Sequence, residues 1–269
     1  MKLSEATHTL RAAGIDSASH DARIIFSELG GISIAATVGT DPESSAPSVI
    51  DAIERRAKRE PLQYIIGRVD FYREKYTVSP DCLIPRQDTE LLVDFAVKNL
   101  PRGARLADLC TGSGCIAISV LCNTTDTTAV CADISAGAIK IATKNSEENG
   151  VADRAAFVRC DVLGEALDGE FFAVISNPPY VTERAYSALA PEIYFEPREA
   201  FVGGGEDGTE FYERITELYH GKIAPRGFIA YEIGYDQADA LKKIAQKYAM
   251  SCEILKDFSG LDRVAILRN

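Results

Sequence analysis

The stretch "RLADLCTGSGCIAISVLC" (Arg105–Cys122) decides the fold. It opens with an apolar run that suits a buried strand and closes with an apolar run free of glycine and proline that suits a helix. The glycines between the two runs permit a tight turn and let the backbone approach a ligand closely. No GK[ST] follows, so the turn is not a phosphate loop. The stretch therefore predicts a strand, a ligand-binding turn and a helix.

The same alternation continues towards the end of the chain. Further strands are predicted in "TAVCADIS", "AAFVRCDVL", "FFAVISNPPY" and "GFIAYEIGY", separated by helical patterns, and "CEILKDFS" and "DRVAILRN" predict a closing antiparallel pair. Strands that alternate with helices form a mostly parallel sheet with right-handed crossovers. The fold class is thus α/β, with a Rossmann-like order of elements over residues 85–269.

The preceding residues predict a different organisation. Residues 1–70 contain short helical patterns, the first of which ("SEATHTLRAAG") we expect to start at Ser4 as N-cap and to stop at Gly14. In residues 71–84 the pattern changes towards alternation between turn residues, which predicts a β-hairpin that links the two parts. We therefore expect a small helical domain, a hairpin linker and an α/β domain.

Composition excludes several classes of function. The chain has 269 residues and a net charge of −11, and most of the acidic excess follows residue 84. An acidic surface repels phosphate backbones, so we expect no direct DNA binding. Seven cysteines without a CxxC pair argue against a zinc site or a disulfide framework. We expect no metal, no membrane segment and a reducing, cytoplasmic location.

Two acids follow the predicted strands at positions that suit a nucleotide. Asp133 ends the second strand, roughly 20 residues after the glycines, where an acid can bind both hydroxyls of a ribose. Asp161 follows the third strand, close to where an adenine would then lie. A dinucleotide and S-adenosylmethionine share this pattern. Successive strand ends that carry acids favour such a site over solvated loop acids.

The stretch "VISNPPYV" (Val174–Val181) adds a polar cluster to the end of the fourth strand. Two prolines stop the strand at about Ser176. The side-chain carbonyl of Asn177 and the backbone carbonyl of Pro178 can accept both hydrogens of a planar NH₂ group, and Tyr180 can stack on its plane. Acceptors placed there would support positive charge that develops on a weakly nucleophilic nitrogen. A proline-rich turn without function is the alternative.

With "DLCTGSG" upstream, "SNPPY" resembles methyltransferases that act on amino groups, and two families share NPPY: adenine N6 methyltransferases and the PrmC/HemK glutamine methyltransferases. Five further stretches are similar to the second family and extend the resemblance over essentially the whole chain: "REPLQYIIGRVDFY" (Arg59–Tyr72), "LIPRQDTELLVDFA" (Leu83–Ala96), "PEIYFEPREAFVGGGEDGTEFY" (Pro191–Tyr212), "YEIG" (Tyr231–Gly234) and "DFSGLDRVAI" (Asp257–Ile266).

The resemblance implies a class I, Rossmann-like methyltransferase domain. It would transfer a methyl group from S-adenosylmethionine to the side-chain amide (N5) of the glutamine in the GGQ motif of class 1 peptide chain release factors, and would release S-adenosylhomocysteine. It implies that residues 1–70 recognise the release factor. The implied cofactor-binding residues are Cys110, Thr111, Gly112, Ser113, Gly114, Asp133, Asp161, Val162 and Asn177, and the implied catalytic residues are Asn177, Pro178, Pro179 and Tyr180.

The sequence departs from the family pattern at Cys110, where many members have glycine, and at Gln87, where many have proline. We expect a monomer. Two rival functions stay open at this point. Methylation of adenine in nucleic acid would require a cleft lined by lysine and arginine. A cofactor-binding scaffold without transferase activity would produce no S-adenosylhomocysteine.

Overall fold

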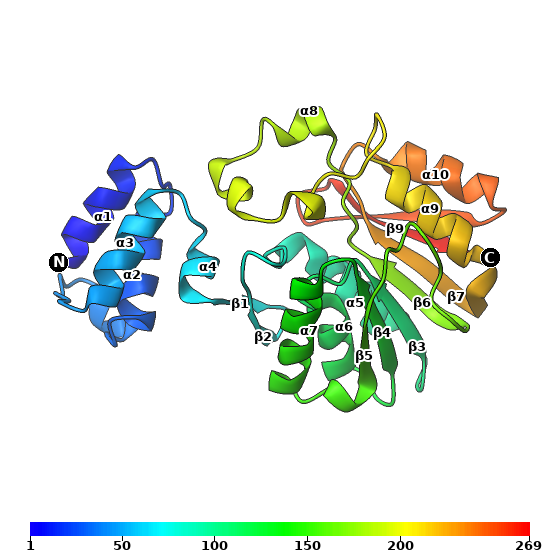
Figure 1. Cartoon of the computed structure of the whole chain (residues 1–269), viewed down its shortest axis with the longest axis horizontal. Helices are drawn as coiled ribbons and strands as arrows, with labels where there is room; N and C mark the ends of the chain where they lie inside the picture. Colours follow the sequence, from blue (N-terminus) through cyan, green and yellow to red (C-terminus); the bar gives the residue numbers. More distant parts are fainter. The chain divides into compact units, whose positions relative to one another are not determined.

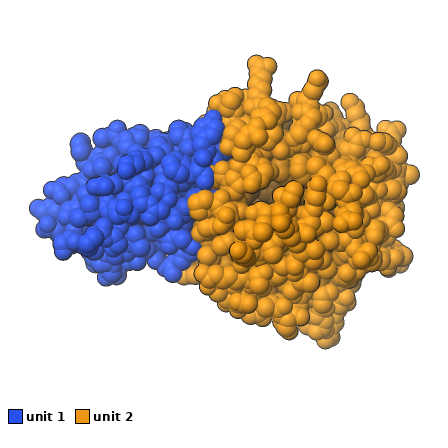
Figure 2. Space-filling model, viewed as in Figure 1, with its two compact units in different colours: residues 1–68, 190–195 blue, residues 69–189, 196–269 orange.

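The computed structural model describes all residues from Met1 to Asn269, and the chain divides into two compact units (Figure 2). Unit 1 comprises residues 1–68 and 190–195, and unit 2 comprises residues 69–189 and 196–269. The short segment Ala190–Phe195 thus belongs to unit 1, although unit 2 supplies the residues on either side of it. The sequence did not predict this exchange of chain between the units.

Unit 1 is helical, as the sequence predicted. Its core is formed by apolar side chains from successive helices, with Leu10, Phe26 and Ile53 fully buried. The elements are α1 (Leu3–Ala12), α2 (Ala18–Glu28), a 3-10 turn (Ile34–Thr37), α3 (Pro47–Ala57) and α4 (Leu62–Ile66).

The predicted N-cap of the first helix is wrong. Helix α1 begins one residue before Ser4, with Lys2 as its N-cap. The Glu5 carboxylate accepts the Lys2 backbone N–H at 2.8 Å, so the N–H of the N-cap residue has a hydrogen-bond partner. Ser4 instead donates its backbone N–H and its hydroxyl to Asp41, at 2.7 and 2.8 Å. The serine that the local pattern assigned to the N-cap is therefore hydrogen-bonded to Asp41, a carboxylate distant in the sequence.

A β-hairpin follows unit 1, formed by β1 (Arg68–Phe71) and β2 (Glu74–Thr77), and so begins before the predicted boundary at residue 71. Strand β2 belongs to unit 2 and packs on its helices α6 (Cys115–Cys122) and α7 (Ala136–Glu148). The buried Tyr76 hydroxyl lies 2.6 Å from Ser119 Oγ, and the backbone of Thr77 exchanges two hydrogen bonds with the Asn145 carboxamide. Asn145 also donates to the Ser113 carbonyl at 2.8 Å, which connects the hairpin to the glycine turn.

Unit 2 is built on a seven-stranded sheet of order β5-β4-β3-β6-β7-β9-β8 (Figure 1). All neighbours are parallel except β9, which runs antiparallel to β7 and β8. The strands are β3 (Arg105–Leu109), β4 (Thr128–Asp133), β5 (Ala155–Arg159), β6 (Phe171–Ser176), β7 (Ile223–Glu232), β8 (Ser251–Lys256) and β9 (Asp262–Arg268). The predicted α/β, Rossmann-like class and the predicted strand end at Ser176 are confirmed.

Helices cover both faces of this sheet (Figure 1). One buried cluster joins α5 and α6 to one face, and a second joins α9 and α10 to the other. Neighbouring strand residues alternate between the two clusters, as Leu106 and Ala107 do, which is the period of a strand. The helices are α5 (Glu90–Asn99), α6 (Cys115–Cys122), α7 (Ala136–Glu148), α8 (Glu183–Tyr186), α9 (Glu210–Tyr219) and α10 (Ala238–Lys247).

The topology places the carboxyl ends of three strands together. Strand β3 pairs with β4 on one side and with β6 on the other, so the order of strands reverses at β3. In open α/β sheets, ligands bind in the crevice outside the carboxyl ends of strands at such a reversal. The glycine turn follows β3, Asp133 is the last residue of β4 and Asn177 follows β6, so all three lie at this crevice.

Candidate active site

A buried carboxylate shapes the glycine turn. Asp108 is fully buried, and its Oδ2 accepts hydrogen bonds from Thr111 Oγ1 at 2.7 Å and from the Ala117 backbone N–H at 3.2 Å. These bonds tie the end of β3 to the first turn of α6. Its Oδ1 has no hydrogen-bond partner. Burial raises the pKa of Asp108 to about 7, because desolvation penalises the charged form.

Glycine is required in the turn for two different reasons. Gly114 has φ +81°, and a Cβ there would lie 2.8 Å from Ile118 Cδ1 and 3.1 Å from Ala142 Cβ, so its absence lets α6 and α7 approach. Gly112 has φ +55°, and a Cβ there would meet nothing within 4 Å, because this residue faces a cavity. Cys110 also has a left-handed backbone, with φ 59°, although it carries a side chain.

Asp133 closes the turn from the neighbouring strand. Its Oδ2 accepts the Gly112 N–H and its Oδ1 the Ser135 N–H, both at 2.9 Å. A carboxylate offers about four lone-pair sites, so two such bonds leave capacity for two further donors. Burial raises the pKa of Asp133, and the negative charge of Glu199 raises it further. The arrangement can hold a pair of hydroxyl groups.

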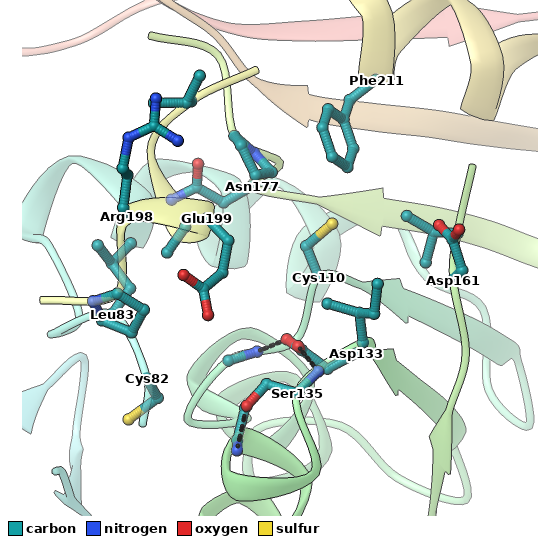
Figure 3. Close-up of a pocket in the computed structure, with 18 of the residues that line it drawn as sticks. Cys82, Leu83, Cys110, Asp133, Ser135, Asp161, Asn177, Arg198, Glu199 and Phe211 are labelled. Carbon is teal, nitrogen blue, oxygen red and sulfur yellow. Dashed lines mark hydrogen bonds between the residues drawn. The ribbon is translucent and has the colours of Figure 1, made fainter. Parts of the chain in front are cut away.

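A cavity of about 460 Å³ joins these features (Figure 3). Seven of the residues that the sequence singled out line it: Cys110, Gly112, Asp133, Asp161, Val162, Asn177 and Pro179. Five others do not line it: Thr111, Ser113, Gly114, Pro178 and Tyr180. Thr111 and Ser113 are buried within the turn. The Tyr180 hydroxyl instead donates to Glu232 Oε1 at 3.3 Å.

Sequence reasoning missed part of the cavity wall. Figure 3 shows the Glu199 carboxylate directed into the same space as that of Asp133. Glu199 belongs to the segment 197–200, and Cys82, Leu83 and Phe211 are further parts of the wall. The stretches "LIPRQDTE" and "FEPREAF" were noted as similar to a family, but their side chains gave no chemical reason to place them near Asp133.

The NPPY segment is braced from behind by glycines. Val181 N–H donates to the Phe201 carbonyl at 2.8 Å, and Gly203 N–H donates to the Val181 carbonyl at 3.1 Å. A Cβ on Gly203 would lie 2.5 Å from the Pro179 carbonyl oxygen, and one on Gly208 would lie 2.2 Å from that of Tyr180. The "VGGGEDG" stretch thus permits backbone to pack directly against backbone, which fixes the loop that carries Asn177.

The fold and the site together define a class of protein. The chain is similar in structure to a ribosomal protein L11 methylase from Lactobacillus delbrueckii subsp. bulgaricus, with a TM-score of 0.53 and 16% identity over 71% of this chain and 83% of that one. At that identity the likeness shows the fold alone. The family model "Methyltransferase small domain" matches residues 87–206. Unit 2 is thus a Rossmann-like methyltransferase domain.

Relatives in sequence identify the family. Residues 2–67 match the "PrmC N-terminal domain" model. A release factor glutamine methyltransferase from Thermodesulfovibrio yellowstonii is 40% identical over 83% of this chain and 81% of that protein. One from Caulobacter vibrioides is 35% identical over 97% of this chain and 93% of that protein. The chain belongs to the release factor glutamine methyltransferase family, so the resemblance drawn from the NPPY motif is confirmed.

Proposed function

We propose that this protein transfers a methyl group from S-adenosylmethionine to the side-chain amide nitrogen of the glutamine in the GGQ motif of class 1 release factors. One observation carries the proposal: a single cavity is lined both by Asp133 and by Asn177. The first can hold a ribose, and the second can hold a carboxamide. The cofactor and the glutamine would therefore meet in one cavity.

The residues present fit the cofactor. The cavity of about 460 Å³ falls within the usual range for small-molecule sites. Gly112 faces it without a side chain, Asp133 has acceptor capacity left, and Asp161 and Val162 line the part beyond β5 where an adenine would lie. When bound, S-adenosylmethionine supplies an electrophilic methyl group on a sulfonium that departs as a neutral thioether.

The NPPY segment would orient the glutamine. Its amide nitrogen is a weak nucleophile because the lone pair is delocalised into the carbonyl. Asn177 Oδ1 and the Pro178 carbonyl would each accept one N–H of the amide, which aims the nitrogen and stabilises the positive charge that develops on it. Alignment of this kind can contribute on the order of 7 kcal/mol at best. The proton would leave to water after the transfer, so no strong base is needed at Asn177.

We assign recognition of the whole release factor to unit 1. Its core holds no cluster of catalytic groups, while Ile34 and Val38 expose large apolar side chains, at 44% and 61%. The variant I34S/V38S should raise KM for an intact release factor and leave KM for a short GGQ peptide unchanged. An equal change for both substrates would contradict this assignment.

We also propose that the protein acts as a monomer in the cytoplasm and does not bind DNA. The net charge of −11 supports the last point. No helix of the structure is both long enough and apolar enough to span a bilayer.

Mass spectrometry tests the proposed reaction. The protein is incubated with S-adenosylmethionine and a release factor, and the added mass of one CH₂ group is located by fragmentation. Methyl on the GGQ glutamine is expected. Methyl on adenine of added nucleic acid, or production of no S-adenosylhomocysteine at all, would refute the proposal.

A further inference from the structure

A relay of hydrogen bonds lies behind Asn177, defined by Asn177, Thr89 and Glu232. Asn177 Nδ2 donates to Thr89 Oγ1 at 3.4 Å, and Thr89 Oγ1 donates to Glu232 Oε2 at 2.5 Å. The relay joins three elements: the loop after β6, the short 3-10 helix Gln87–Thr89 and the end of β7. Thr89 and Glu232 are each 2% exposed, so water does not compete for the bond between them, whereas Asn177 is half-buried and lines the cavity.

The direction of the relay follows from proton counting. A carboxylate only accepts hydrogen bonds, whereas a hydroxyl has one proton to donate and lone pairs with which to accept. Thr89 therefore donates its hydroxyl proton to Glu232, and its oxygen can bind Asn177 only as an acceptor. The NH₂ end of the Asn177 carboxamide must then face Thr89. A flipped carboxamide would place two acceptors, Asn177 Oδ1 and Thr89 Oγ1, against each other.

We propose that Glu232, acting through Thr89, fixes the orientation of the Asn177 carboxamide so that its Oδ1 stays available to accept the N–H of the substrate amide. Glu232 and Thr89 are positioning residues, since they act through Asn177. The inference rests on the proposed function, because it takes an NH₂ group as the partner of Oδ1. The same carboxylate accepts from the Tyr180 hydroxyl at 3.3 Å and so holds a second member of the NPPY segment.

The relay requires Glu232 to be ionised. Burial raises its pKa, while the bond from Thr89 and the positive charge of Arg263 oppose that shift. Arg263 is itself shared with Asp257 and Asp88, at 3.1 and 3.3 Å, and the charge of Asp88 raises the pKa of Glu232. A protonated Glu232 could donate to Thr89, which would then be free to donate to Asn177 Oδ1 and reverse the relay. Turnover should therefore fall on the acid side as Glu232 gains its proton.

The test compares T89V, which keeps the shape of the side chain and removes the hydroxyl, with T89S, which keeps the hydroxyl. T89V should lower kcat on the release factor by about 10- to 100-fold, because misplaced catalytic groups cost factors of this size. The affinity for S-adenosylmethionine, measured by calorimetry, should stay within about threefold of wild type. This change is much smaller than the expected loss in kcat, because the relay acts on the group that orients the glutamine. T89S should recover most of the activity. T216V is the matched control. Thr216 is a buried threonine like Thr89, but its hydroxyl bonds Tyr231 at 2.9 Å and is not part of the relay, so T216V should leave kcat close to that of wild type.

Two further measurements separate positioning from a merely structural role. In an N177A background, T89V should cost little more than twofold in kcat, because the group it positions is already gone. E232Q has no carboxyl group to protonate at this position, so the fall of kcat at low pH, the acid limb of its pH profile, should disappear. Multiplicative losses in T89V/N177A, an unchanged kcat in T89V, or an acid limb that persists in E232Q would each overturn the relay. Wild type is assayed in parallel: if it leaves the glutamine unmethylated the proposed function fails, whereas a normal wild type with a fully active T89V refutes the relay alone.

Discussion

Asp108→Asn should make the stability of the protein less dependent on pH. The Asp108 carboxyl is fully buried, one of its oxygens has no partner, and burial raises its pKa to about 7. The unfolded chain would release this proton near the ordinary value of 3.8. Between these two values the folded state holds one proton more than the unfolded state. Linkage then requires the free energy of unfolding to fall as pH rises, by about 1.36 kcal/mol per pH unit from this group.

The full effect of the Asp108 charge follows from the same two values. A gap of about three pKa units corresponds to about 4 kcal/mol of stability that is present at low pH and lost above pH 7. Asparagine carries no charge, and its carbonyl oxygen can still accept from Thr111 and Ala117. D108N should therefore be more stable than wild type at pH 8.5, and the difference should shrink or reverse at pH 4.5, where the wild-type carboxyl is protonated in the folded state.

Urea unfolding followed by far-ultraviolet circular dichroism at several pH values measures this difference, since the chain contains no tryptophan. Asp153→Asn is the control, because Asp153 is an exposed acid of the same unit. Taking the difference from wild type at each pH removes the contribution of every other titrating group. Parallel curves for wild type and D108N between pH 4.5 and pH 8.5 would refute the reasoning.

Three further substitutions test other parts of the molecule. Asp133→Ala should weaken S-adenosylmethionine binding by about 100-fold in calorimetry, because two charge-assisted bonds at about 1.5 kcal/mol each are lost; unchanged affinity would remove the ribose assignment. Asn177→Ala should lower kcat by about 100-fold or more while the cofactor affinity changes little, because its acceptor matters most as charge develops; a loss confined to cofactor affinity would contradict that role. Glu192→Gln should lower the stability of unit 1 by about 1–2 kcal/mol in thermal unfolding, because Glu192 pairs with Arg56 at 3.1 Å and Arg59 at 2.8 Å; Glu183→Gln, which breaks an exposed pair with Arg198, is the control and should change little.

The elements of unit 2 were predictable because each carries a local signal. Strand β6 stops at Ser176 because the following prolines cannot continue it, and α6 occupies the whole apolar run Cys115–Cys122. The acid at the end of β4 and the glycines after β3 meet because parallel strands of a sheet end at one edge. These predictions needed only the local periodicity, which gives the strands and helices, and their order along the chain, which gives the parallel sheet.

The exchange of residues 190–195 between the units had no such signal. Arg56 is nearly buried in unit 1, where it bonds Asp21 at 2.8 Å and also reaches Glu192, which lies 136 positions away in the sequence. A basic run such as "RRAKRE" (Arg55–Glu60) is, by local pattern alone, typical of a solvated helix face. The pairing of Arg56 with two carboxylates depends on the fold of the whole chain, so no local pattern could assign it.

The relay behind Asn177 shows the same limit at the site itself. Thr89 and Glu232 are separated by 143 positions, and each lies in a stretch that the sequence singled out only by resemblance. A buried carboxylate close to the active site is costly unless its charge is used or compensated. Here three groups compensate it: the hydroxyls of Thr89 and Tyr180 and the charge of Arg263. Two of these partners connect the carboxylate to the NPPY segment: Thr89 bonds Asn177, and Tyr180 is itself a member of the segment. The hydrogen bonds that compensate the buried charge therefore also orient the groups that would hold the substrate. An asparagine chosen for its acceptor needs a device that keeps that acceptor facing the substrate, and an ionised carboxylate behind a hydroxyl is the simplest one that this fold provides.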